Sequence, residues 1–208
     1  MLLVTGASAD FIYIDDNVKH PVQIDAGAGD DYLRVGGSYS TILSREGSDT
    51  IHITSGESDI ESGPGDDNVR ITSVGPARVY LGEGEDIARA GPGLTFIDAG
   101  PGDDVIVGGI GEGHNVLCGG DGNDTLIGGL GNDVLRGDSG ADTFVWRYAD
   151  ADKGTDHIMD FKVGEDKLDL SDLLQGETAN TLESYLNFSL NNGSTVIDID
   201  ANKDGTFD

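Results

Sequence analysis

A large apolar residue recurs at intervals of nine through much of the chain. It is the middle one of three residues that end each nine-residue unit, and six residues rich in glycine and aspartate precede them. The three residues predict a short strand with its middle side chain in a core, and the glycine-rich six predict a turn. The predicted inward side chains are Leu33, Ile42, Ile51, Ile60, Val69, Val79, Ile97, Ile106, Leu126, Leu135 and Phe144, with the smaller Ala88 in the same series.

Two such units make a coil of 18 residues with a turn on each side. Strands of successive coils would then stack in parallel, about 4.8 Å apart. Because each unit buries its apolar side chain only against its neighbours, stacking gives a solenoid with a thin aliphatic core. The predicted fold is all-β, a right-handed parallel β-roll with a β-rich cap at its C-terminal end.

The nine-residue motif is clearest in three consecutive copies, GGDGNDTLI, GGLGNDVLR and GDSGADTFV, which run from Gly119 to Val145. Earlier copies begin at Ala26, Ser62 and Ala99, and the register slips by one residue near Pro76 and by two near His114. The pattern predicts three regions: a degenerate coil at 1–25, the roll at 26–145 and a capping region at 146–208.

Aspartate ends the turn on only one edge of the predicted roll. On that edge the sixth turn residue is always Asp, and we call these seven residues the Asp row: Asp31, Asp49, Asp67, Asp86, Asp104, Asp124 and Asp142. On the opposite edge the same position is predicted to hold Ser40, Ser58, approximately Ala77, Thr95, Gly113 and Asp133. Random decay of the repeats is the alternative, but seven aspartates against one argue for a functional row.

Stacked carboxylates about 4.8 Å apart would repel by roughly 3–4 kcal/mol per pair at an effective dielectric constant near 20. The formal net charge of the chain is −27, so its other side chains do not relieve this repulsion. Carboxylates and turn carbonyls form an all-oxygen donor set, which favours Ca²⁺ over the stricter octahedral Mg²⁺. Zinc would require His or Cys ligands, and the four His are scattered. The sequence therefore predicts several Ca²⁺ ions along the Asp row, with a further one near Asp133.

The composition also excludes several classes of function. With 12 basic and 39 acidic residues, the chain lacks the basic surface that nucleic acids and anionic membranes require. A single cysteine, Cys118, excludes an internal disulfide, and no apolar run approaches the length of a membrane span.

The tail after residue 145 loses the period of nine. Alternation predicts strands at 155–161 and 166–170, and a helical turn at 171–174. A roll needs a cap over its last coil, and the expected capping cluster is Phe144, Trp146, Ile158, Phe161, Leu168 and Leu170. A further ion at this junction would use Asp150, Asp152, Asp156 and Asp169.

Near the end, Asp200, Asn202 and Asp204 precede Gly205 in the spacing of the first half of an EF-hand loop. An Asx-rich turn between two strands explains the same residues. The closing Glu of an EF-hand would fall beyond Asp208.

The tandem nonapeptides, followed by GADTFVW, DHIMDF and DKLDLSDLL, resemble the C-terminal region of RTX proteins exported by type I secretion. The tail is most similar to that of large RTX adhesins of Gram-negative bacteria, including biofilm and ice-binding kinds. The resemblance implies a secreted, extracellular or cell-surface protein that has a C-terminal secretion signal, upstream adhesin domains and the type I secretion machinery as a partner. It also implies a tail that continues beyond Asp208.

In that family each motif aspartate and the turn carbonyls bind Ca²⁺. The resemblance therefore assigns the Asp row and Asp133 as ligands. The glycines implied by the same motif are Gly29, Gly65, Gly84, Gly102, Gly120, Gly122, Gly129, Gly131 and Gly140.

Two functions fit these observations. The first is a non-enzymatic RTX module of an adhesin that folds on calcium outside the cell. The second is an accessory module of a secreted enzyme of the metalloprotease, lipase or alginate epimerase type. The sequence contains no HExxH, no GxSxG and no plausible Ser/His/Asp set, so we expect no active site within the chain. A ligand site on the aspartate-poor edge, near Tyr39, Ser55, Ser58 and Thr95, stays open.

Overall fold

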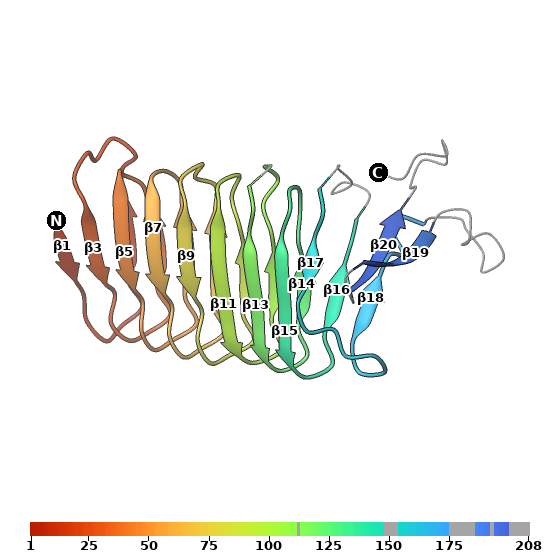
Figure 1. Ribbon diagram of the computed structural model, residues 1–208. Coiled ribbons are helices and arrows are strands. Elements are labelled where there is room, and N and C mark those ends of the chain that lie inside the picture. The colour runs from red at the N-terminus through yellow and green to blue at the C-terminus, as the bar shows by residue number, and fades with distance from the viewer. Residues whose placement is uncertain (112, 148–153, 175–185, 192–193, 200–208) are drawn as a thin grey trace.

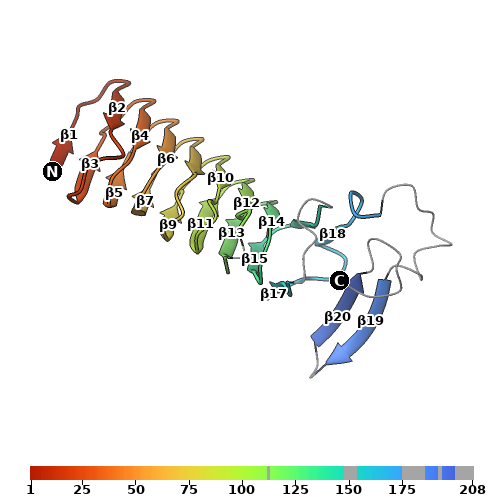
Figure 2. The same ribbon diagram turned by 90° about the horizontal axis from the view of Figure 1, so that it is seen from above.

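Two parallel nine-stranded sheets face each other in the computed structural model and form an elongated solenoid (Figure 1). The structure describes residues 1–111, 113–147, 154–174, 186–191 and 194–199. The chain alternates between the two sheets, so each coil adds one strand to each of them, as the two layers seen from above show (Figure 2). The all-β parallel β-roll predicted from the repeats is confirmed.

The first sheet contains the odd-numbered strands, in the order β1 (Leu2–Val4), β3 (Val22–Asp25), β5 (Tyr39–Leu43), β7 (Glu57–Glu61), β9 (Ala77–Tyr80), β11 (Thr95–Pro101), β13 (Val116–Asp121), β15 (Val134–Ser139) and β17 (His157–Ile158). The second sheet contains the even-numbered strands, in the order β2 (Phe11–Ile14), β4 (Tyr32–Val35), β6 (Thr50–Ile53), β8 (Asn68–Ile71), β10 (Ile87–Arg89), β12 (Val105–Val107), β14 (Thr125–Ile127), β16 (Thr143–Val145) and β18 (Lys167–Asp169). A separate antiparallel hairpin is formed by β19 (Leu186–Asn191) and β20 (Ser194–Ile199).

The strand register explains the two slips in the sequence period. Leu33 pairs with Ile51, which is one regular coil away. The coil that pairs Ile60 with Val79 is longer by one residue, and the coil that pairs Ile97 with Leu117 is longer by two. The extra residues lie in turns on the aspartate-poor edge, so the core register of the strands is preserved.

Every predicted inward side chain is buried, including the small Ala88. The predicted inward residues of each sheet stack in one column. Leu117 pairs with Ile97 in the column of the first sheet, a position that the sequence prediction left empty at the second slip. Small flanking positions such as Ala26 and Ala99 are also buried. On the second sheet a further buried column, Ile14, Val35, Ile53 and Ile71, widens the core from β2 to β8. The core is therefore thin, and it is wider at the N-terminal end of the roll.

Both sheets extend beyond residues 26–145. Strands β1 to β3 form a coil before the first clear motif, and β17 and β18 add a further strand to each sheet after the last one. The predicted tail strands are present but shorter than 155–161 and 166–170, and residues 171–174 form a turn. Of the expected capping cluster, Phe144 is buried, and Trp146, Ile158 and Leu168 pack against the core. The Phe161 ring lies 6.0 Å from that of Phe144, and Leu170 is half-buried.

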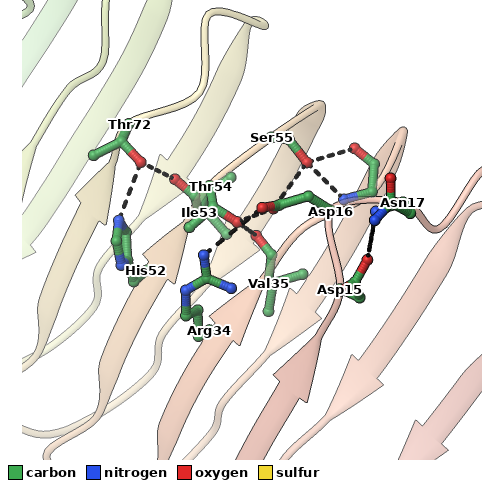
Figure 3. Close-up of polar contacts among 11 residues, drawn as sticks. Asp15, Asp16, Asn17, Arg34, Val35, His52, Ile53, Thr54, Ser55 and Thr72 are labelled. Carbon is green, nitrogen blue, oxygen red and sulfur yellow. Dashed lines mark hydrogen bonds and ion pairs between the residues drawn. The ribbon is translucent and has the colours of Figure 1, made fainter.

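A hydrogen-bonded bracket holds the N-terminal coils together on the aspartate-poor edge (Figure 3). Asp16, in the loop after β2, accepts hydrogen bonds from the hydroxyls of Thr54 and Ser55, two coils further on. Its other oxygen lies 3.7 Å from the guanidinium of Arg34, on the coil between them. Side-chain hydrogen bonds therefore link three successive coils at this end of the edge.

Asp16→Ala should lower the free energy of unfolding of the calcium-loaded roll by about 1 kcal/mol, because it removes two hydrogen bonds and a partly exposed ion pair. Urea denaturation at saturating calcium measures the change. Lys19→Ala, in the same loop, is the matched control and should change stability by less than about 0.5 kcal/mol. Equal effects of the two variants would show that the bracket adds no stability.

Candidate metal centre

The turns that lead from the first sheet to the second place the Asp row along one edge of the roll. Each turn ends one residue before a strand of the second sheet, so the register of that sheet aligns the aspartates. All seven side chains are at most 3% exposed. The row predicted from the sequence is thus assembled as a continuous buried line.

A ladder of hydrogen bonds connects the aspartates. The backbone N–H of each one donates to the Oδ1 atom of the aspartate on the next coil, at 2.7 Å from Asp49 to Asp67 and 3.0 Å from Asp124 to Asp142. The ladder continues to Asp10 at its start, at 2.7 Å from Asp31, and to Asp166 at its end, at 3.1 Å from Asp142. One carboxylate oxygen per coil is therefore used to fix the side chain.

The sequence prediction missed Asp10 and Asp166. Asp10 ends the six residues between β1 and β2, so its position in a turn was a usable signal. Asp166 lies 24 residues beyond Asp142, after the period of nine has ended. Only the strand pairing of β16 with β18 places it in the row.

The second carboxylate oxygen has no partner along most of the row. The Oδ2 atoms of Asp31, Asp49, Asp67, Asp86, Asp104 and Asp124 are buried and accept no hydrogen bond. A buried carboxylate is costly unless a charge or a donor compensates for it. A row of orphaned oxygens, one per coil, fits a set of bound cations.

Burial also raises the pKa values of these carboxyls, because it disfavours the charged form. The pKa of Asp67 is raised to about 8, that of Asp104 to about 7, and those of Asp86 and Asp124 to about 6. Neighbouring aspartates raise the pKa of Asp67 further, and the hydrogen bond from the preceding N–H opposes this effect. Without a cation, Asp67 and part of the Asp104 population would therefore hold a proton at pH 7 in the folded chain.

Backbone carbonyls of the turns stack beside the aspartates. A Cβ on Gly65 would overlap the carbonyl oxygen of Gly47, and a Cβ on Gly102 would overlap that of Gly84. Both Gly65 and Gly102 have a positive φ, so a side chain there would be strained as well as blocked. Successive turns therefore approach closely enough to present their carbonyl oxygens in a line.

The nine glycines assigned by the motif all have positive φ. They separate into two groups. Gly129 and Gly131 lie on the opposite edge, and the other seven lie on the edge of the Asp row: Gly29, Gly65, Gly84, Gly102, Gly120, Gly122 and Gly140. Gly47 belongs to the same series, and the sequence prediction omitted it.

The opposite edge changes character along its length. Ser40 and Ser58 are buried, and their hydroxyls have no hydrogen-bond partner. The position assigned to Gly113 is instead held by Asn115, because Val116 pairs with Val134 and thereby aligns Asn115 with Asp133. Thr95 donates its N–H to Asn115 Oδ1, and Asn115 donates to Asp133 Oδ1. The ladder position on this edge is therefore neutral from Ser40 to Asn115 and acidic only at Asp133 and beyond.

Asp133 and Asp156 form the acidic end of the opposite edge. The N–H of Asp133 donates to Asp156 Oδ1 at 2.9 Å, so Asp156 occupies the next step of that ladder. A Cβ on Gly128 would lie 3.1 Å from Asp133 Oδ2 and 3.3 Å from Asp156 Oδ2, so both oxygens border one glycine. Trp146 Nε1 donates to Asp156 Oδ2 at 2.8 Å and links this site to the cap.

Other predicted ligands are not brought to this site. The Ser171 side chain, and then its backbone N–H at 3.0 Å, donate to Asp169 and lower the pKa of this carboxyl. Asp150 and Asp152, as well as Asp200, Asn202 and Asp204, lie outside the described residues.

Within the described part of the chain, no three His, Cys, Asp or Glu side chains cluster as a metal site. A cation on the Asp row would therefore be held by carboxylates from successive coils together with turn carbonyls, which is an oxygen environment suited to Ca²⁺. The described residues also contain no helix that is long and apolar enough to cross a membrane.

Comparison with known families agrees with this geometry. The RTX calcium-binding nonapeptide repeat, a model of four copies, matches residues 25–60. The C-terminal domain of the peptidase M10 serralysins matches residues 96–207, which is more than half of the chain. No curated protein and no solved structure matches the sequence. The chain therefore belongs to the peptidase M10 serralysin C-terminal family and carries RTX calcium-binding repeats.

Proposed function

We propose that this chain is a calcium-folded module of a protein exported by type I secretion, and that it has no catalytic activity of its own. The row of buried Oδ2 atoms without partners carries the proposal. Ca²⁺ would supply the positive charge that compensates these buried carboxylate oxygens. Since the site forms only in the folded chain, the free energy of calcium binding would contribute to the free energy of folding. The chain would then stay unfolded where calcium is scarce and fold as it emerges outside the cell.

The roll supports this coupling because stability is shared between neighbouring coils. A coil that binds calcium aligns the N–H that donates to the next aspartate, as between Asp86 and Asp104 at 2.7 Å. Folding that begins on one coil would therefore favour the next, and it would help to prevent the exported chain from moving back. The cap around Trp146 and Asp156 would close the C-terminal end.

The parent protein has two candidate classes. The resemblance of the tail to large Gram-negative RTX adhesins supports an adhesin with its binding domains upstream, exposed at the cell surface or in a biofilm. The match to serralysin C-terminal domains supports the second class, an accessory module of a secreted enzyme. Mass spectrometry of the intact secreted polypeptide, followed by a casein hydrolysis assay, separates them. Proteolysis abolished by zinc chelation would support the metalloprotease type of the enzyme class, and its absence would exclude that type.

The test of the module itself is a calcium titration of chelator-treated protein at pH 7.5, followed by far-UV circular dichroism. We expect a cooperative change from a coil spectrum to a β spectrum with Ca²⁺, and no such change at equal concentrations of Mg²⁺. Isothermal titration calorimetry of the same sample gives the number of ions. A β spectrum that is already complete without calcium would refute the proposal.

A further inference from the structure

The outer face of the second sheet carries no acidic side chain from β2 to β16. Burial alternates along these strands, so one residue in two points outward. The outward residues are Phe11, Tyr13, Tyr32, Arg34, Thr50, His52, Asn68, Arg70, Ile87, Arg89, Val105, Val107, Thr125, Thr143 and Val145. The absence of acidic side chains from this face is unusual in a chain with 39 acidic residues. The outer face of the first sheet, by contrast, carries Asp25, Glu57, Asp59, Glu61 and Asp98.

Four basic residues stand in one line across this face, and we call them the basic row: Arg34, His52, Arg70 and Arg89. Each pairs in register with the next on the neighbouring strand. Figure 3 shows Arg34 and His52 side by side on β4 and β6, and His52 is held there by a 3.1 Å hydrogen bond with Thr72. Three of the 12 Lys and Arg residues in the chain thus meet in a single row.

The basic row is largely uncompensated. Arg70 and Arg89 are exposed, and no acidic side chain in the described residues forms a salt bridge with either of them. Among the described residues, Arg34 forms a salt bridge with Asp16 alone, at 3.7 Å. Like charges directly opposite on adjacent strands destabilise a sheet. Arg70 and Arg89 are directly opposite each other, so this pair lowers the stability of the sheet, and an anionic ligand would compensate for it.

The Asp row does not supply this compensation. Asp31 and Arg34 are three residues apart along one coil, as are Asp67 and Arg70. At about 3.3 Å per residue the separation is roughly 10 Å, which is too long for a salt bridge between the two side chains. Bound calcium would reduce the influence of the Asp row further.

Aromatic side chains extend the basic row at its N-terminal end. The Arg34 guanidinium lies 5.0 Å from the centre of the Tyr13 ring, a cation–π contact. Beside it, the rings of Phe11 and Tyr32 stack with their centres 5.0 Å apart, and both are exposed. Flat, exposed rings next to fixed positive charges suit a ligand that has apolar ring faces as well as charge.

We propose that this face binds a linear carboxylated polysaccharide, which runs across the strands along the basic row. Its guanidinium groups repeat once per strand, or every 4.7–4.9 Å, with His52 in the one place not filled by Arg. A chain of (1→4)-linked uronic acids has one carboxylate per sugar ring, a spacing close to that repeat. The carboxylates would bind the arginines, and sugar rings would stack on Tyr13 and Tyr32.

Nucleic acid fits the face less well. Duplex DNA carries a charge about every 1.7 Å of its axis and needs a denser basic surface than three arginines provide. The net charge of −27 would also repel a polymer of that charge density at long range.

The test uses the calcium-loaded full chain and isothermal titration with a hexameric oligogalacturonate, with neutral maltohexaose as the ligand control. We expect binding of the acidic hexamer alone. The double variant Arg70→Gln/Arg89→Gln should bind at least about tenfold more weakly, because two charge-assisted hydrogen bonds are lost. Arg70→Lys/Arg89→Lys should retain part of the affinity, since the charge is kept.

Arg78→Gln/Arg136→Gln is the matched control, because it removes the same charge from the first sheet. It should change the affinity by less than about twofold. Equal weakening by both double variants, no binding to the wild type, or binding of a single-stranded hexanucleotide at least as tight as that of the uronate would overturn the proposal. Circular dichroism of each variant with calcium reports folding separately, so a failure of this site is distinguishable from a failure of the calcium switch.

Discussion

Asp67→Asn should weaken calcium-dependent folding and, at the same time, stabilise the calcium-free roll. The amide keeps the Oδ1 atom that accepts the N–H of Asp49 at 2.7 Å, and it keeps the shape of the side chain. The substitution removes the negative charge from Oδ2, the buried oxygen that has no hydrogen-bond partner. Burial raises the pKa of this carboxyl to about 8. The same atom that costs free energy without calcium is the one that calcium needs.

The opposite edge already contains such a substitution. Asn115 accepts from Thr95, and its own Nδ2 donates to Asp133 Oδ1 at 3.1 Å. An Asn at position 67 can donate to Asp86 in the same way, because the ladder continues there at 2.7 Å. The added Nδ2–H therefore has an acceptor, and the substitution leaves the ladder intact.

We expect the calcium midpoint of Asp67→Asn to rise by about tenfold or more, since a charged ligand is lost from the centre of the row. In calcium-free buffer at pH 7.5 the urea midpoint or residual β signal should increase, by at least about 1 kcal/mol where it can be measured. Ser58→Ala is the matched control, because its buried hydroxyl lies on the opposite edge and has no partner. The same calcium midpoint for Asp67→Asn and Ser58→Ala would contradict this account of the row. A calcium-free Asp67→Asn variant that is less stable than the calcium-free wild type would also contradict it.

Acidification should fold the calcium-free chain. Burial raises the pKa of Asp67 to about 8, of Asp104 to about 7 and of Asp86 and Asp124 to about 6, whereas the unfolded value is 3.8. Between these values the folded state binds more protons than the unfolded state, so stability falls as pH rises. A carboxyl whose pKa is one pH unit higher in the folded chain changes stability by about 1.4 kcal/mol across that range. Folding without calcium should therefore be weakest above pH 8 and improve as the pH falls towards 4.

Circular dichroism in calcium-free buffer, from pH 8.5 to pH 5, measures this dependence. The series should stop there, because the isoelectric point near 4.1 favours precipitation. Calcium should show the opposite trend, with a higher midpoint at pH 5, since protons compete for the same oxygens. Asp67→Asn should show a smaller pH dependence than the wild type. A calcium-free chain that loses β structure on acidification would mean that the buried carboxyls do not limit folding.

The local pattern of the sequence determined the fold class and most of the Asp row. A nine-residue unit contains its own turn and strand, so the burial of Ile51 or Leu126 follows from positions within the unit. The side of the roll on which Asp49 and Asp67 lie follows from counting coils of 18 residues. These predictions were correct because each unit contains the same glycine-rich turn and the same alternating strand. These local elements repeat the same geometry in every coil.

Prediction failed where the spacing between coils is irregular. Asp10 joins the row across 21 residues and Asp166 across 24, and Asn115 replaces Gly113 in the opposite ladder. In each case the strand pairing of the whole sheet sets the alignment, and a local motif cannot determine the length of a turn.

Only the tertiary structure decided which oxygens lack a partner and which charges meet. Oδ1 of each aspartate is occupied by an N–H from another coil, and this contact leaves Oδ2 alone in the interior. The basic row joins Arg34, Arg70 and Arg89, which are 18 or more residues apart and show no local motif. Hydrogen bonding and repulsion depend on distance in space, and the winding of the roll brings residues from distant parts of the chain within one strand spacing of each other.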